Sequence, residues 1–106
     1  MNDFYQMEET AIENSNYSLP HNTTLQHLAK LSILEDKPIM YDYWTGSLDK
    51  DVIIGVRDAG EKLLVKSEDE YTSPISKIYK VESEYIIVTE NSIYVISSEV
   101  ATKRIS

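Results

Sequence analysis

Apolar residues change their spacing near residue 39, so the chain is expected to contain a helical stretch followed by a β-rich one. In the helical stretch the apolar side chains occupy more than one side of a helix: Leu25, Leu28, Ala29, Leu31, Ile33 and Leu34. Thr23 and Gln26 have the spacing of a capping box, which predicts that the helix begins there. Proline disfavours the α conformation in the residue before it, so Pro38 is predicted to end the helix.

This apolar arc is too wide for one sheet face to cover. We predict that Leu28 and Leu31 are buried within the domain and that Leu25 or Leu34 is left for a second contact. The second contact could be made by another part of the chain or by a partner.

From Ile39 onward, short apolar runs alternate with turn residues, which is typical of β-strands. The predicted strands are Ile39–Thr45, Val52–Arg57, Lys62–Ser67, Ile75–Val81, Tyr85–Thr89 and Ser92–Ile96, with a short edge strand in Val100–Ser106. Turns are expected at Gly46–Lys50 and at Asp58–Gly60. The last two long strands are apolar on both faces, so their hairpin is predicted to lie centrally, with material packed on each side.

The predicted fold class is therefore α+β and mainly β. One N-terminal helix packs on a small antiparallel sheet, or on a partly closed barrel, of five or six strands. We assign residues 23–106 to this single domain.

Residues 1–22 differ from the rest because they are polar and acidic, and their apolar residues follow no steady period: Phe4, Tyr5, Met7, Ile12, Tyr17 and Leu19. Such a segment cannot build its own core. We predict an arm that is flexible or that becomes ordered on another surface, within its own domain or on a partner.

Composition narrows the classes of function. Among 106 residues, 18 acids against 10 bases give a net charge of −8, which repels phosphate backbones, so direct nucleic-acid binding is not expected. The chain lacks cysteine, which removes disulfides and thiolate chemistry. It contains no apolar run near 18 residues and no apolar leader, so we predict an intracellular, cytosolic protein that does not enter a membrane.

Candidate catalytic chemistry is sparse. Two imidazoles, His21 and His27, could serve as bases, and neither accompanies a nucleophile motif. The acids of Asp49–Asp51 and Glu68–Glu70 lack the spacing of a calcium loop, and the three glycines are isolated. We predict no catalytic residue, metal or cofactor, and a protein that is not an enzyme.

An aromatic cluster offers a site for protein contacts. In an extended strand, Tyr41 and Tyr43 would lie on one face and Trp44 on the other, where we expect Trp44 to be core. Tyrosine and tryptophan often anchor interfaces. Together with Phe4 and Tyr5 of the arm, Tyr41 and Tyr43 form the predicted partner-binding site.

Two hypotheses of function follow. The first is a non-enzymatic interaction or structural module, a minor component of a virion or of another large assembly. A protein partner is then expected, and self-association into a homo-oligomer is left open. The alternative is an acidic inhibitor that imitates nucleic acid and blocks a basic host protein through the loop of Glu68, Asp69 and Glu70.

Overall fold

The computed structural model describes residues 18–105, which form two helices, a 3₁₀ turn and eight strands. In chain order they are α2 (Asn22–Glu35), β1 (Ile39–Met40), α3 (Trp44–Leu48), β2 (Ile53–Val56), the 3₁₀ turn (Asp58–Gly60), β3 (Lys62–Ser67), β4 (Glu70–Tyr71), β5 (Ile75–Val81), β6 (Glu84–Thr89), β7 (Ile93–Ser97) and β8 (Ala101–Arg104). The predicted class, α+β and mainly β, is confirmed.

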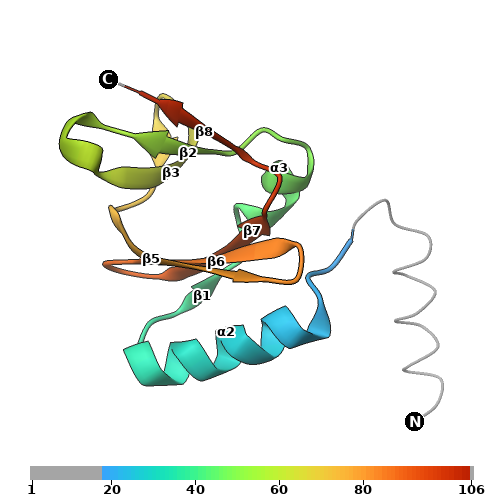
Figure 1. Cartoon of the computed structure of the whole chain (residues 1–106). Coiled ribbons are helices and arrows are strands. Elements are labelled where there is room, and N and C mark those ends of the chain that lie inside the picture. The colour runs from blue at the N-terminus through green and yellow to red at the C-terminus, as the bar shows by residue number, and fades with distance from the viewer. Residues whose placement is uncertain (1–17, 106) are drawn as a thin grey trace, which may run out of the picture.

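The described strands form two mixed sheets of four strands each, which do not close into a barrel (Figure 1). The first sheet has the order β1-β7-β6-β5 and the second has the order β4-β3-β2-β8. β1 runs parallel to β7, and β8 runs parallel to β2. The predicted single antiparallel sheet or partly closed barrel was therefore wrong, because both parallel pairs join strands that are distant in sequence and that no hairpin signal connects.

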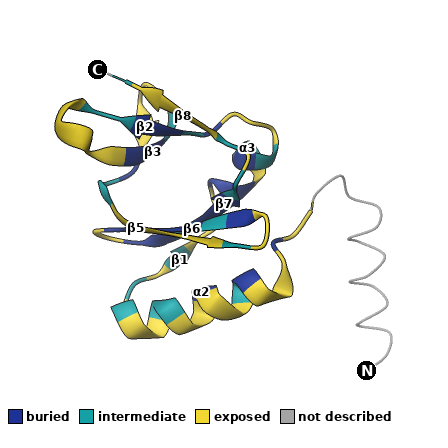
Figure 2. Ribbon diagram, in the orientation of Figure 1, coloured by how far each residue is buried: buried dark blue, intermediate teal, exposed yellow. Residues whose placement is uncertain are grey.

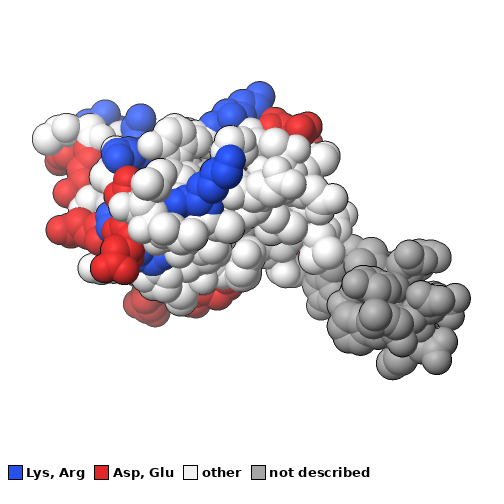
Figure 3. All heavy atoms as spheres, turned by 90° about the horizontal axis from the view of Figure 1, so that it is seen from below, with Lys and Arg blue, Asp and Glu red and all other residues white. Residues whose placement is uncertain are grey.

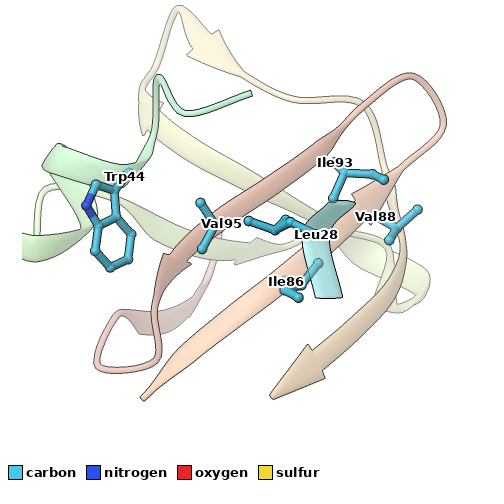
Figure 4. Packing of buried hydrophobic residues seen from close by; sticks show 6 residues of the cluster. All are labelled: Leu28, Trp44, Ile86, Val88, Ile93 and Val95. Carbon is cyan, nitrogen blue, oxygen red and sulfur yellow. The ribbon is translucent and has the colours of Figure 1, made fainter. Parts of the chain in front are cut away.

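The molecule has three layers, in which α2 covers one face of the first sheet and the second sheet covers the other (Figures 1 and 2). The core on the α2 side contains Leu28, Trp44, Ile86, Val88, Ile93 and Val95 (Figure 4). The core toward the second sheet contains Tyr43, Val52, Ile54, Leu64, Ile87 and Ile96. The first sheet is thus the middle layer.

The β6–β7 hairpin has both faces buried, as its sequence predicts. Ile86 and Val88 lie in the core on the α2 side, whereas Ile87 between them lies in the core toward the second sheet. Strand β5 also begins directly after Pro74, and β2 and β3 form the predicted hairpin around Gly60, whose φ of 84° suits glycine.

We expect the backbone amides of Ile87, Val88, Ile93 and Val95 to exchange with solvent last, near the limit set by global unfolding. All four residues are fully buried in the middle layer, so opening them requires both cores to separate. Native-state hydrogen exchange followed by NMR measures this. Slower exchange in β2 and β3 than in this hairpin would contradict the central position of the hairpin in the stability of the fold.

α2 differs from its prediction at both ends. It begins at Asn22, with His21 as the N-cap residue and no side-chain capping hydrogen bond from it, so the expected capping box at Thr23 is not the start. It ends at Glu35, three residues before Pro38, because Asp36 adopts a left-handed conformation and the Lys37 N–H donates to the carbonyl of Ser32.

The first predicted strand, Ile39–Thr45, is mostly absent. β1 contains two residues, and the chain then turns into α3, which also replaces the predicted turn at Gly46–Lys50. The change has a packing reason, because Trp44 belongs to the core on the α2 side and Tyr43 to the other core. Entry into α3 is what buries these two consecutive rings in different cores.

Residues 18–22 of the predicted arm contact the domain. Pro20 is buried, and the indole N–H of Trp44 donates to the carbonyl of Ser18 over 2.8 Å. The rest of the predicted arm, including Phe4 and Tyr5, lies outside the described residues, so the arm stays a prediction.

Candidate functional site

The structure separates the two tyrosines of the predicted aromatic site. Tyr41 is 51 % exposed, whereas Tyr43 is 4 % exposed, stacks edge-to-face on Tyr94 at 5.3 Å and lies under the ammonium group of Lys66. Burial raises the pKa of Tyr43 to about 12, and the neighbouring Tyr94 and carboxylates add to the rise. Tyr43 is thus a core residue, and of this pair Tyr41 presents its ring to solvent. The predicted core position of Trp44 is confirmed.

The acidic residues Glu68, Asp69 and Glu70 lie at the turn between β3 and β4, and all three are exposed. The carboxylate of Glu70 is 3.4 Å from the ammonium group of Lys66. One of the three acids therefore lies beside a base. Mimicry of nucleic acid through this loop stays a prediction.

A buried carboxylate that our sequence reasoning missed gathers polar groups at the start of α2. Glu84 accepts hydrogen bonds from the backbone N–H of His21 (3.2 Å), the hydroxyl of Thr24 (2.6 Å) and the hydroxyl of Ser83 (3.2 Å). The ring nitrogen Nδ1 of His21 lies 2.8 Å from its second oxygen. One carboxylate thereby ties the first turn of α2 to the β5–β6 turn.

The Glu84 carboxylate is held ionised. Burial alone raises the pKa of Glu84, but the hydrogen bonds donated by Thr24, His21 and Ser83 outweigh burial, and the net result is a pKa below the ordinary value of 4.5. The sequence indicates this contact, because alternate residues of a strand point to the same face. Glu84 therefore shares a face with Ile86 and Val88, which pack toward α2. A carboxylate at that position points toward the helix.

The His21–Glu84 pair resembles the base and orienting acid of a catalytic triad, but its other contacts are structural. The Thr24 hydroxyl donates to Glu84 rather than to the imidazole. Within residues 18–105, no group of three His, Cys, Asp or Glu side chains could hold a metal ion. Each buried side-chain polar atom of the same residues has a hydrogen-bond partner, so the described core offers no orphan group for a ligand.

The outer side of α2 carries the largest exposed apolar side chains of the helix. Ile33 and Leu34, here called the α2 patch, are 81 % and 80 % exposed, whereas Leu28 is fully buried against the first sheet. The predicted wide arc is thus covered on one side only by the described residues (Figure 2). Seen from the α2 side, charged groups gather at one end of the domain and a large part of the remaining surface is uncharged (Figure 3).

Concave regions lie near the sheets, and apolar side chains make up most of the lining of two of them. The α2–β5 groove, with a volume of about 630 Å³, lies between α2 and strand β5 and is lined by His27, Leu31, Tyr79, Lys80, Val81, Glu82 and Ile86. The other, about 480 Å³, lies on the second sheet and is lined by Arg57, Leu63, Val65, Ser67, Glu68, Tyr71 and Ile105. Apolar side chains with a few polar groups line both regions, as is common in clefts that bind ligands.

No described helix is long and apolar enough to cross a membrane. Comparison of the whole chain with family models, curated proteins and solved structures found no match.

Proposed function

We propose that this protein is a non-enzymatic interaction or structural module that acts as a minor component of a virion or of another large assembly. The observation that carries the proposal is the α2 patch. Two adjacent branched side chains, Ile33 and Leu34, are about four-fifths exposed on a helix whose opposite side buries Leu28 against the first sheet. When a partner covers these exposed apolar side chains, their surface is removed from water, and this lowers the free energy of the complex.

The α2 patch lies on a rigid element, which favours its use as a binding surface. Leu28 anchors α2 to the first sheet, and the Glu84 cluster holds its first turn. The Lys77–Glu35 ion pair (2.9 Å) joins the last turn of α2 to β5. A surface held at both ends loses little conformational freedom on binding, so more of the contact energy appears as affinity.

The assignment to a virion or a large assembly rests on composition. The chain is rich in isoleucine, serine, asparagine and tyrosine, with eight tyrosines, and has three glycines and three prolines. An AT-rich coding genome tends to give this composition. A short, single-domain chain without cysteine and with this composition fits a viral source, and this association is the basis for the choice of assembly.

The double substitution Ile33→Gln/Leu34→Gln should abolish capture of the partner and leave the melting temperature unchanged. Interface anchors typically cost at least ~2 kcal/mol of binding when truncated, roughly 30-fold in affinity. Affinity capture from the native source, with the captured proteins identified by mass spectrometry, compares this variant with the unaltered chain.

The matched control is Ala29→Gln/Lys30→Gln, which changes two exposed residues of the same helix and should retain the partner. Tyr41→Ala tests the aromatic prediction in the same assay. If the double variant retains its partner, the α2 patch is not the binding surface. If Tyr41→Ala alone loses the partner, the binding surface lies at Tyr41 and not at the α2 patch.

A further inference from the structure

Strand β5 is the longest edge strand among the described strands. It forms the outer strand of the first sheet and has seven residues, whereas the edge strands β1 and β4 have two each and β8 has four (Figure 1). An edge strand presents unpaired backbone N–H and C=O groups that can pair with another strand. Ile78 and Tyr79, at its middle, are each 38 % exposed.

We propose that two copies of this chain pair antiparallel through β5, with Tyr79 on the two-fold axis. The proposal rests on the proposed function, since self-association is one form of assembly. With the axis perpendicular to the sheet, both α2 helices lie on the same face of a continuous eight-stranded sheet. Tyr79 then opposes Tyr79 of the second copy, Ile78 opposes Lys80, and Lys77 opposes Val81.

The two lysines of β5 exclude two of the alternative registers. Residues directly opposite across an antiparallel pair point to the same face, so only registers centred on a residue keep both helices on one side. Centring on Lys77 or on Lys80 would place two like charges directly opposite each other, which is destabilising. Lysines on an edge strand thus act against wrong pairings without preventing the right one.

Registers centred on Ile75, Ser76, Ile78 or Val81 also avoid opposed lysines. Those at the ends of β5 pair fewer residues of the strand, and the shape of β5 disfavours the register at Ile78. The pairing of β5 with β6 is irregular between Ile75 and Lys77 and regular from Lys77 to Val81. The midpoint of the regular part is Tyr79. A two-fold axis there uses regular strand throughout, whereas an axis at Ile78 extends the new ladder into the irregular part.

Side chains around Tyr79 favour a second copy in this position. Tyr79 and Val81 line the α2–β5 groove together with Leu31 and Ile86, so a ring from the second copy would extend an apolar surface that already exists. The ammonium group of Lys77 is neutralised within its own copy by Glu35 at 2.9 Å. Opposed tyrosines are among the cross-strand pairs that stabilise sheets.

Light scattering coupled to size-exclusion chromatography should give twice the chain mass of 12.2 kDa. Tyr79→Lys should halve that mass, because it places two lysines opposite each other on the axis. The control is Tyr71→Lys, since Tyr71 is 52 % exposed on an edge strand of the other sheet and should leave the dimer intact. A single-chain mass for the unaltered protein, or a dimer that persists in Tyr79→Lys, would overturn the proposal.

Single cysteine substitutions test the register, because the chain contains no cysteine of its own. Under mild oxidation Tyr79→Cys should form a disulfide-linked dimer at least tenfold faster than Ile78→Cys. Residues directly opposite have Cα atoms roughly 4.5–5.5 Å apart, within the range for a disulfide, and diagonal residues are farther. The two positions are equally exposed, so access does not explain a difference. Faster linkage of Ile78→Cys would overturn the register.

The Ile33→Gln/Leu34→Gln variant separates this inference from the proposed function. It should remain a dimer, because neither residue belongs to β5. A monomeric protein whose partner capture still depends on the α2 patch would overturn the β5 pairing and leave the proposed function standing. A dimer whose partner capture does not depend on the α2 patch would overturn the proposed function and leave the β5 pairing standing.

Discussion

Leu28→Ala should lower the free energy of unfolding by about 2–5 kcal/mol, the range found for leucine truncations at fully buried sites. Leu28 is the helical residue at the centre of the core on the α2 side and has no exposed surface. Its neighbours Ile86 and Val95 belong to the central hairpin, whose positions are fixed by packing on both faces, so the cavity can close only in part. Urea denaturation followed by circular dichroism measures the loss.

Leu34→Ala on the same helix is the matched control. Its side chain is 80 % exposed, so the same chemical change should alter stability by less than about 0.5 kcal/mol. Equal losses from the two substitutions would show that α2 does not pack through Leu28. The same pair also tests the α2 patch, because Leu34→Ala should leave the fold intact and act on binding.

Elements whose signal is local could be predicted from the sequence. The β6–β7 hairpin is apolar on both faces around Glu90 and Asn91, which indicates both its turn and its burial. Pro74 could mark the start of β5 because proline tolerates the first position of a strand. In these places hydrophobic periodicity and turn residues indicate the same structure, and the tertiary contacts of the fold do not change it.

Elements set by distant contacts could not be predicted. The stretch from Tyr41 to Trp44 alternates like a strand, yet the structure buries Tyr43 and Trp44 in two different cores by starting α3. The pairing of β8 beside β2 is likewise a contact between residues almost 50 positions apart. Periodicity indicates which face of a strand is apolar and does not indicate which strand lies beside it.

The sequence predicts that exposed apolar and aromatic surfaces exist, but it does not predict which residues form them. The width of the apolar arc on α2 predicts that part of it is left uncovered, and the structure places that part at Ile33 and Leu34. Tyr41 stays exposed, while Tyr43 is removed from the predicted site by the start of α3. The free edge of β5 follows from strand order, which needs the three-dimensional pairing of all four strands of the first sheet.

Glu84→Gln should cost about 1–3 kcal/mol of stability at neutral pH, because the amide has one accepting oxygen instead of two and lacks the charge that strengthens hydrogen bonds to a carboxylate. The hydroxyl of Thr24 and the backbone N–H of His21 share one oxygen of Glu84, and both lie where α2 begins. In glutamine the oxygen can stay on that side, but the NH₂ group then faces the Ser83 hydroxyl and the His21 ring nitrogen, which must accept a hydrogen bond from it instead of facing a carboxylate oxygen. Chemical denaturation at pH 7 measures the loss, with Glu82→Gln, an exposed position in the same turn, as the control.

The same variant should also change how stability depends on pH. Since the pKa of Glu84 is lower in the folded chain than its ordinary value, ionisation of Glu84 stabilises the fold above that ordinary value. This stabilisation is lost as the pH falls from about 4.5 through the lower folded pKa, because the carboxylate must then accept a proton. The protonated acid resembles glutamine, so the stability difference between the unaltered chain and Glu84→Gln should narrow below pH 4.5. A difference that stays constant down to pH 3 would show that Glu84 acts by shape and not by charge.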